Sequence, residues 1–102
     1  MHKGGITYIL CSPDKNVLYV GVTSDLQTRV WQHKTHFYER SFTARYNCTQ
    51  LVWYKFFISI EEAIAEEKRI KSGSRKKKED LISAFNYEWK DLWNDIKDLR
   101  SY

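Results

Sequence analysis

Four polar side chains lie in segments that otherwise have the composition of a protein core. Tyr8 and Tyr19 each lie within an apolar run, and Arg29 and Glu67 lie in later segments with helical spacing. A phenol can transfer a proton, a guanidinium binds oxyanions through a planar fork of donors, and a carboxylate binds divalent cations. Taken singly, each residue type is more often structural or solvated. Their chemistry therefore depends on whether the fold brings them together.

The first half of the chain is predicted to form a hairpin followed by a helix. Residues 6–11 and 17–22 are rich in Ile, Tyr, Leu and Val and flank SPDKN, whose Pro, Asp and Asn favour a turn. Ser24 or Asp25 can cap a helix over about 25–37. Its apolar face is predicted from the spacing of Leu26, Val30, His33 and Phe37.

The second half is predicted to contain one strand and three helices. QLVWYKFFI, residues 50–58, has the composition of a strand, and a capping box with a Gly stop indicates a helix over about 60–71. Ser74 can cap a helix over 75–85. A last helix over about 88–100 is predicted from the stripe Trp89, Leu92, Trp93, Ile96 and Leu99. This order of elements predicts an α+β domain with a small, three-stranded, mostly antiparallel sheet flanked by helices.

Composition and charge narrow the class of protein. The 102 residues, 42% apolar and 29% charged, indicate a single globular domain over 1–102 with its core at about 4–93. The net charge of +4 weakly favours a polyanionic partner. No stretch approaches the ~20 apolar residues of a membrane span, so we expect a cytoplasmic protein without a membrane partner. Cys11 and Cys48 are expected to be buried, reduced thiols.

The spacing of the polar residues resembles the GIY-YIG nuclease superfamily. Ile6-Thr7-Tyr8 is followed eleven residues later by Tyr19-Val20-Gly21, and Arg29 lies ten residues beyond Tyr19 in SDLQTRVWQHK. The segments SFTARYNCTQLVWY, EEAIAEEKRIK and LISAFNYEWKDLW extend the resemblance over about residues 4–93. It points to the small single-domain members related to the amino-terminal domain of the excision-repair nuclease.

The resemblance implies a site and a metal. Its catalytic residues would be Tyr8, Tyr19, Arg29, His33, Glu67 and Asn86. Arg29 would contact the scissile phosphate, Glu67 would bind Mg²⁺ or Mn²⁺, and Asn86 would support the site. His33 would assist activation of the nucleophile. We favour Tyr8 as the immediate base with Tyr19 positioning water or phosphate, and the reverse assignment stays open.

The sequence also departs from the family pattern. The first motif reads Ile6-Thr7-Tyr8 where the family has Gly-Ile-Tyr, and Val22, Thr23 and Ser24 occupy a region in which some relatives carry a lysine. That lysine can help to deprotonate a phenol or water. If that lysine is required, activity would be weak or would depend on His33.

The resemblance implies DNA as the partner, with branched, flapped or damaged DNA as candidate substrates. Gly21 would let a phosphate approach the hairpin closely. The other residues predicted to contact the backbone are Lys34, Arg45, Lys68, Lys71, Arg75, Lys76 and Lys77. Trp31, Phe42 and Tyr46 could stack on unpaired bases, although core packing is favoured for at least half of them.

Two alternatives to a Mg²⁺-dependent endonuclease remain at this point. One is a nucleic-acid-binding domain with weak or no turnover, which the missing lysine favours. The other is an interaction protein that needs a protein partner or a second copy of itself. The sequence does not separate DNA from RNA as substrate.

Overall fold

The computed structural model describes residues 4–98 and shows an α+β fold, as predicted. In chain order the elements are β1 (Gly5–Cys11), β2 (Leu18–Thr23), α1 (Leu26–Lys34), α2 (Phe42–Arg45), β3 (Gln50–Phe57), α3 (Ile60–Lys71), α4 (Arg75–Phe85) and α5 (Trp93–Ile96). The three strands form one sheet in the order β2-β1-β3, and both pairings are antiparallel. The predicted fold class is therefore confirmed.

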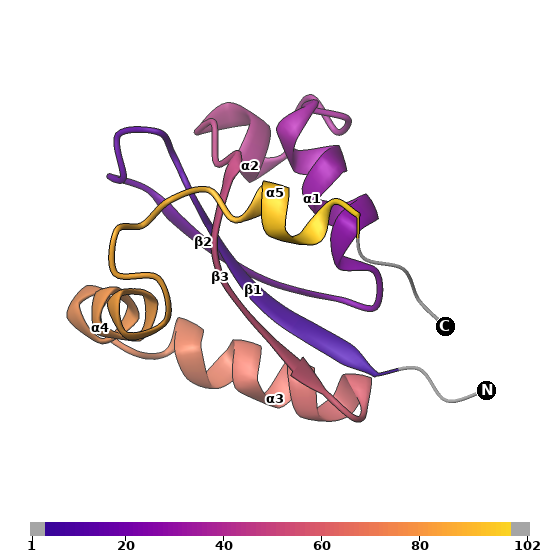
Figure 1. The fold of residues 1–102 in the computed structure, drawn as a ribbon, viewed down its shortest axis with the longest axis vertical. Helices are drawn as coiled ribbons and strands as arrows, with labels where there is room; N and C mark the ends of the chain where they lie inside the picture. Colours follow the sequence, from indigo (N-terminus) through magenta and orange to yellow (C-terminus); the bar gives the residue numbers. More distant parts are fainter. Residues whose placement is uncertain (1–3, 99–102) are drawn as a thin grey trace.

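The central strand β1 is covered on both faces of the sheet. All seven of its residues are buried, because α1, α2 and α5 lie on one face and α3 and α4 on the other (Figure 1). Ile6, Tyr8 and Leu10 contribute to the core under α1 and α5, and Ile9 and Cys11 contribute to the core under α3 and α4. Successive strand residues point to opposite faces, so one apolar strand supplies both cores.

Helix α3 packs very close to the start of β1. A Cβ atom on Gly5 would lie 2.8 Å from the Cβ of Ala63 and 2.9 Å from the Cα of Ile60, so only glycine allows this approach. The Thr7 hydroxyl donates a hydrogen bond to the Ala63 carbonyl at 2.7 Å. These contacts fix α3 along β1 and β2, which determines where the side chains of α3 can reach.

Helix α1 ends three residues earlier than the predicted 37. The Phe37 amide donates to the Gln32 carbonyl at 2.9 Å and the His36 amide to the His33 carbonyl at 3.3 Å, with His36 at φ 53°. This is a Schellman motif, with His36 at the left-handed position that glycine usually fills. Phe37 therefore leaves the apolar face of the helix and is 56% exposed.

The last predicted helix is much shorter than expected. Its first predicted turn is not helical, because Trp89 adopts φ 55° and its indole N–H donates to the Ser83 hydroxyl at 3.0 Å. Of the predicted helix over 88–100, only Trp93–Ile96 is helical in the part that the structure describes. Leu99, the last residue of the predicted stripe, lies outside the described residues. The Trp89 ring thus packs back toward α4, which the stripe pattern alone does not reveal.

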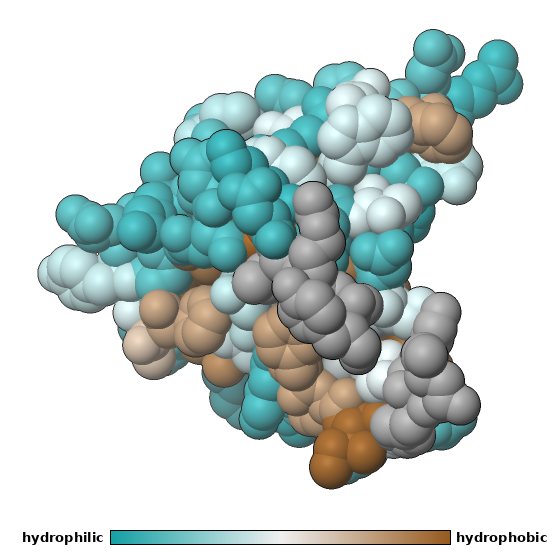
Figure 2. Space-filling view, turned by 45° about the vertical axis from the view of Figure 1, so that its right-hand side comes forward, coloured by the Kyte–Doolittle hydropathy of each residue, from teal (hydrophilic) through white to brown (hydrophobic). Residues whose placement is uncertain are grey.

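Several large apolar side chains are exposed on the surface instead of being buried in the two cores. Figure 2 shows apolar surface gathered on the lower part of one face and hydrophilic surface above it. Phe56 and Ile58, at the end of β3, are 58% and 76% exposed.

No helix within residues 4–98 is long and apolar enough to cross a membrane. Both cysteines are buried free thiols, in different clusters.

Candidate active site

Tyr8 and Tyr19 lie on the same face of the hairpin, next to Gly21. Their ring centroids are 6.3 Å apart, and Tyr8 is paired with Gly21 across the strands. A Cβ atom on Gly21 would lie 2.5 Å from the Tyr8 hydroxyl oxygen and 2.9 Å from the Tyr19 ring. The space above Gly21 is thus filled by Tyr8, and the approach of a phosphate to Gly21 stays a prediction. The Tyr8 ring extends over β2, the edge strand, and carries its hydroxyl to that edge.

Helix α1 places Arg29 beside both phenols. The Arg29 guanidinium opposes the rise in the pKa of Tyr8 through its charge and a hydrogen bond, so it lies within reach of that hydroxyl. Its Nη1 donates to the Gln32 side chain at 3.1 Å, and the guanidinium carbon lies 5.6 Å from the Tyr38 ring centroid. Asp25 caps the start of this helix by accepting from the Thr28 amide. The cap and the Tyr38 ring limit where the guanidinium can go.

His33 lies one turn after Arg29 and is in direct contact with Tyr8. The Tyr8 hydroxyl and the His33 Nε2 are hydrogen-bonded at 3.0 Å, and the His33 Nδ1 is hydrogen-bonded to the Thr43 hydroxyl at 2.7 Å. Burial, with a smaller effect of the Arg29 charge, lowers the pKa of His33 to about 4. His33 is therefore a neutral imidazole at pH 7, with both ring nitrogens engaged.

The surroundings of Tyr8 favour the neutral phenol. Burial raises the pKa of Tyr8 most, the neighbouring Tyr19 raises it further, and Arg29 partly opposes this. The negative charge of Glu67 adds a smaller rise. Tyr8 thus carries its proton at pH 7, and it can become a base only when positive charge or a proton acceptor favours the phenolate.

Glu67 reaches the site from the other side of the sheet. Helix α3 packs along β1 and β2, and Glu67 is near enough for its charge to act on Tyr8. Its side chain is 16% exposed and accepts a hydrogen bond from the Lys71 ammonium at 3.0 Å. Among residues 4–98, no three His, Cys, Asp or Glu side chains are grouped for metal binding. Glu67 is the single carboxylate among the predicted catalytic residues, so water and substrate oxygens would have to complete the ligands of a metal here.

The Asn86 side chain is hydrogen-bonded to β3 and to the chain after α4. Asn86 follows α4, and its amide nitrogen donates to the Val52 carbonyl at 3.2 Å and to the Lys90 carbonyl at 2.8 Å. Its side-chain oxygen accepts from the Lys90 amide at 3.3 Å. Val52 is the extra residue of a β-bulge, because Ile9 pairs with Trp53 and Leu10 with Leu51. These contacts give Asn86 a structural role in holding the chain after α4 to β3.

Two of the residues predicted to bind DNA are engaged within the protein. The Lys34 ammonium donates to the Thr49 carbonyl at 2.9 Å and pairs with Asp91, so it joins α1 to the segment before α5. Arg75 donates to the carbonyls of Lys15 and Asn16 at 2.6 and 2.7 Å. Their side-chain donors hold elements together, and their contact with a phosphate backbone stays a prediction.

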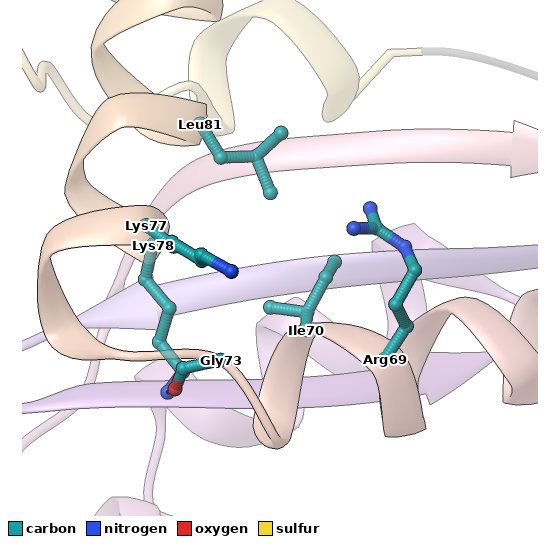
Figure 3. A pocket seen from close by; sticks show the side chains of 6 residues that line it. All are labelled: Arg69, Ile70, Gly73, Lys77, Lys78 and Leu81. Atoms are coloured by element: carbon teal, nitrogen blue, oxygen red, sulfur yellow. Dashed lines mark hydrogen bonds between the residues drawn. The ribbon is translucent and has the colours of Figure 1, made fainter.

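The remaining predicted basic residues are exposed on three helices. Arg45 lies on α2, Lys68 and Lys71 on α3, and Lys76 and Lys77 on α4. Lys71 pairs with Glu67 and Lys76 with Asp80. Lys77 lines a pocket of about 80 Å³ between α3 and α4 together with Arg69, Ile70, Gly73, Lys78 and Leu81 (Figure 3). Ile70 belongs to the core on the face opposite Tyr8, so this pocket is separate from the phenols.

Three site neighbours were absent from the predicted catalytic set. Thr43, which is buried, bonds to His33, and the Ser41 hydroxyl bonds to Thr43 at 3.2 Å. Tyr38 flanks Arg29 from the loop after α1. They lie in the aperiodic segment between helix and strand, where only the Ser41 cap of α2 is visible as a local signal.

Comparison with known proteins adds a family and a structural neighbour. The GIY-YIG catalytic domain family matches residues 4–80, a range that includes Tyr8, Tyr19, Arg29, His33 and Glu67 but not Asn86. Among solved structures, the solution NMR structure of the UPF0213 protein BH0048 from Bacillus halodurans is similar, with 30% sequence identity and a TM-score of 0.55. The similarity covers 96% of this chain and 99% of that chain. No match was found among curated protein sequences.

Proposed function

The chain belongs to the GIY-YIG nuclease superfamily, and from this premise we propose that it is a divalent-metal-dependent endonuclease that hydrolyses DNA phosphodiester bonds. The observation that carries the proposal is the meeting of four family residues, Tyr8, Tyr19, Arg29 and His33, at the β2 edge, with Glu67 in electrostatic range. Branched, flapped or damaged DNA are the substrates we propose to test first.

Arg29 is the residue that would bind the scissile phosphate. Hydrolysis adds charge to the non-bridging oxygens as water attacks phosphorus and the bond to the 3′ oxygen breaks. A guanidinium can donate to two of these oxygens at once, whereas an ammonium offers a single point charge. The position of Arg29 beside both phenols would hold the phosphate next to Tyr8 and Tyr19.

His33 is the residue that would take the proton of Tyr8 once positive charge at the site favours the phenolate. In the free protein, the raised pKa of Tyr8 and the lowered pKa of His33 both oppose this transfer. The His33 imidazole is neutral and 3.0 Å from the hydroxyl, so Nε2 can accept when Nδ1 carries its hydrogen. The Thr43 hydroxyl, 2.7 Å from Nδ1, can accept that hydrogen and so favour this tautomer. The Tyr8 phenolate, favoured by the Arg29 charge, would then take a proton from the attacking water. This arrangement offers a replacement for the lysine that some relatives carry.

The Glu67 carboxylate is a ligand of the kind that Mg²⁺ or Mn²⁺ prefers. Mg²⁺ is usually bound through one or two carboxylates plus substrate phosphate, and it keeps several waters. Glu67 would supply the carboxylate, and the Lys71 ammonium that pairs with it would compete with the cation. The bound cation would neutralise charge on the phosphate and on the leaving oxygen.

A nucleic-acid-binding domain without turnover is the second candidate function. The observation that favours it is the raised pKa of Tyr8 together with Val22, Thr23 and Ser24 in the place of the lysine. Such a protein would keep Arg29 as a phosphate contact and would bind DNA without cutting it. Cleavage assays separate the two functions.

The test compares cleavage by matched glutamate variants. Purified protein is incubated with supercoiled, flapped and forked DNA in Mg²⁺ or Mn²⁺, as wild type, Glu67→Gln, Arg29→Ala and Glu61→Gln. Glu61 is an exposed carboxylate on the same helix, so Glu61→Gln controls for the loss of one charge. We expect Glu67→Gln and Arg29→Ala each to lower the rate about 100-fold or more, and Glu61→Gln to leave it unchanged.

Two outcomes contradict the proposal. Equal cleavage by wild type, Glu67→Gln and Arg29→Ala would identify a contaminating nuclease. Binding of DNA by the wild type without cleavage of any substrate in either metal would establish the binding domain instead.

A further inference from the structure

A row of exposed aromatic rings leads away from the site along the end of α1. The Arg29 guanidinium lies over the Tyr38 ring, the Phe37 ring is 5.0 Å from that of Tyr38, and the Trp31 ring is 6.1 Å from that of Phe37. Trp31, Phe37 and Tyr38 are 48%, 56% and 51% exposed. The Schellman turn at the end of α1 produces this row, because it directs Phe37 out of the core.

A second row of rings starts at Tyr19 and runs over α2. The Phe42 ring lies 6.0 Å from the Tyr19 ring and 4.7 Å from the Tyr46 ring. Phe42 and Tyr46 are 48% and 45% exposed. We call the two sets, Trp31-Phe37-Tyr38 and Phe42-Tyr46, the aromatic rows.

The half-exposed rings of the aromatic rows lie close to one another and to the candidate site. Single exposed apolar side chains are normal on a surface, but contiguous ones indicate a binding site. The sequence had favoured core packing for at least half of Trp31, Phe42 and Tyr46, and the structure leaves all three half-exposed. Each row begins at a residue of the site itself, Arg29 or Tyr19.

The charges in the same segment favour an anionic ligand. Arg40 and Arg45 are exposed and form no ion pair with any residue between 4 and 98, and Glu39 is the acidic residue beside them. Stacking rings next to unpaired cations suit a strand whose bases and phosphates are both accessible. In a duplex the base faces are covered by their neighbours, so they cannot reach such rings.

We propose that the aromatic rows stack on unpaired bases, so that the substrate of this site is DNA that is single-stranded next to the scissile phosphate. This inference rests on the proposed nuclease function for the position of the phosphate at Arg29. The rows would accept bases of any sequence, because every base has a π-face. Arg29, stacked on Tyr38, would join the row to the bound phosphate.

Binding measurements without metal test the proposal apart from catalysis. In EDTA, fluorescence anisotropy is recorded for a labelled single strand of about 20 nucleotides and for the blunt duplex of the same sequence. The proteins are wild type, Trp31→Ala, Tyr46→Ala and Tyr87→Ala. Tyr87 is 87% exposed and follows α4, outside the aromatic rows, so it is the matched aromatic control.

We expect the single strand to bind at least about tenfold more tightly than the duplex at equal salt, as stacking requires. Trp31→Ala and Tyr46→Ala should each weaken binding of the single strand by roughly five- to a hundredfold and leave duplex binding unchanged. Tyr87→Ala should change neither. Saturating single strand should also quench the tryptophan emission of the wild type more than that of Trp31→Phe, since a stacked base quenches Trp31.

Other results overturn the proposal. Equal or tighter binding of the duplex, or equal single-strand affinity in Trp31→Ala, Tyr46→Ala and Tyr87→Ala, would remove the stacking role. Cleavage of duplex DNA with that result would leave the nuclease function standing without the inference. Aromatic-dependent binding without cleavage of any DNA would leave the stacking on unpaired bases standing and would overturn the nuclease function.

Discussion

The position of the Tyr8 ring depends on the lack of a side chain at Gly21. The two residues are paired across β1 and β2, and the ring of Tyr8 occupies the space in which a side chain at position 21 would lie. A glycine in a strand usually indicates such a close approach. The orientation of the Tyr8 phenol therefore depends on a residue that has no side chain.

Replacing Gly21 by alanine should move Tyr8. The new methyl would lie 2.5 Å from the Tyr8 ring, and relieving that overlap should cost about 1–3 kcal/mol of the free energy of unfolding. Urea denaturation measures the loss. The control is Gly73→Ala, whose Cβ would meet the Ile70 carbonyl at 3.4 Å, an ordinary contact, and should be tolerated. Unchanged stability and cleavage in Gly21→Ala would show that the ring is free to move.

His33 should make the protein sensitive to mild acid. The folded state lowers the pKa of His33 to about 4 from an ordinary 6.5, so the unfolded chain takes up the proton first as the pH falls. The stabilisation is complete above about pH 6.5 and is lost as the pH falls toward 4, by up to about 3 kcal/mol. Urea midpoints between these pH values measure it.

Two histidine variants isolate that contribution. His33→Gln should lose the part of the pH dependence that arises between about 6.5 and 4, and His36→Gln should keep it, because His36 is hydrogen-bonded to Asn47 on the surface. The same slope in His33→Gln and wild type would assign the acid sensitivity to other groups.

At this scale the sequence predicted most of the candidate site. Motif spacing and family resemblance identified Tyr8, Tyr19, Arg29, His33 and Glu67, because each lies at a fixed place in a strand or helix. Thr43 could not be predicted as the partner of His33, since the two are joined by a segment without a period. The contact of Gly21 with Tyr8 depends on strand register, which residue types alone do not fix.

At the scale of elements, Arg75 fastens α4 to the β1–β2 turn. Its guanidinium donates to two turn carbonyls and to Glu79 on its own helix. Lys15, in this turn, adopts φ 64°, so the turn has an uncommon backbone conformation that the contact helps to hold. A basic residue at a helix start is otherwise unfavourable, and this tertiary role accounts for its presence.

Removing the Arg75 side chain should loosen the hairpin. Arg75→Ala should lower the free energy of unfolding by about 1–2 kcal/mol, since charge-assisted hydrogen bonds to backbone carbonyls are lost. Lys76→Ala should leave the free energy of unfolding nearly unchanged, because its pair with Asp80 is exposed. Thermal or urea unfolding measures both. An equal effect of the two substitutions would remove the fastening role of Arg75.

Elements with local sequence signals were predicted well, and those bounded by a non-glycine residue in the left-handed region were not. Helix α3 was predicted within its observed bounds, because Ser59 caps its start, although Gly73 does not adopt the left-handed conformation of the predicted stop. The end of α1 and the loss of helix at Trp89 both depend on non-glycine residues in the left-handed region. Sequence rules assign that conformation mainly to glycine and asparagine. The end of α1 was therefore predicted too late and the start of the last helix too early.

At the scale of the whole molecule, the α+β class followed from the order of the elements, but the order of the strands did not. The hairpin predicted the pairing of β1 with β2, whereas nothing local showed that β3 would join the other edge of β1. That pairing is decided by two cores that form together, one on each face. Because β3 pairs with β1, the outer edge of β2 has no neighbouring strand in this sheet, and the candidate site lies at that edge.

The strand order also sets a sequence of events for folding. The β1–β2 hairpin closes over a short turn, but Gly5 meets Phe57 only when two residues about 50 positions apart come together. Closing the longer loop costs more chain entropy, so β3 is expected to join after the hairpin. Until it does, both the Ile9 side of β1 and its unpaired edge are open to other chains, and aggregation during refolding should depend on how quickly β3 arrives.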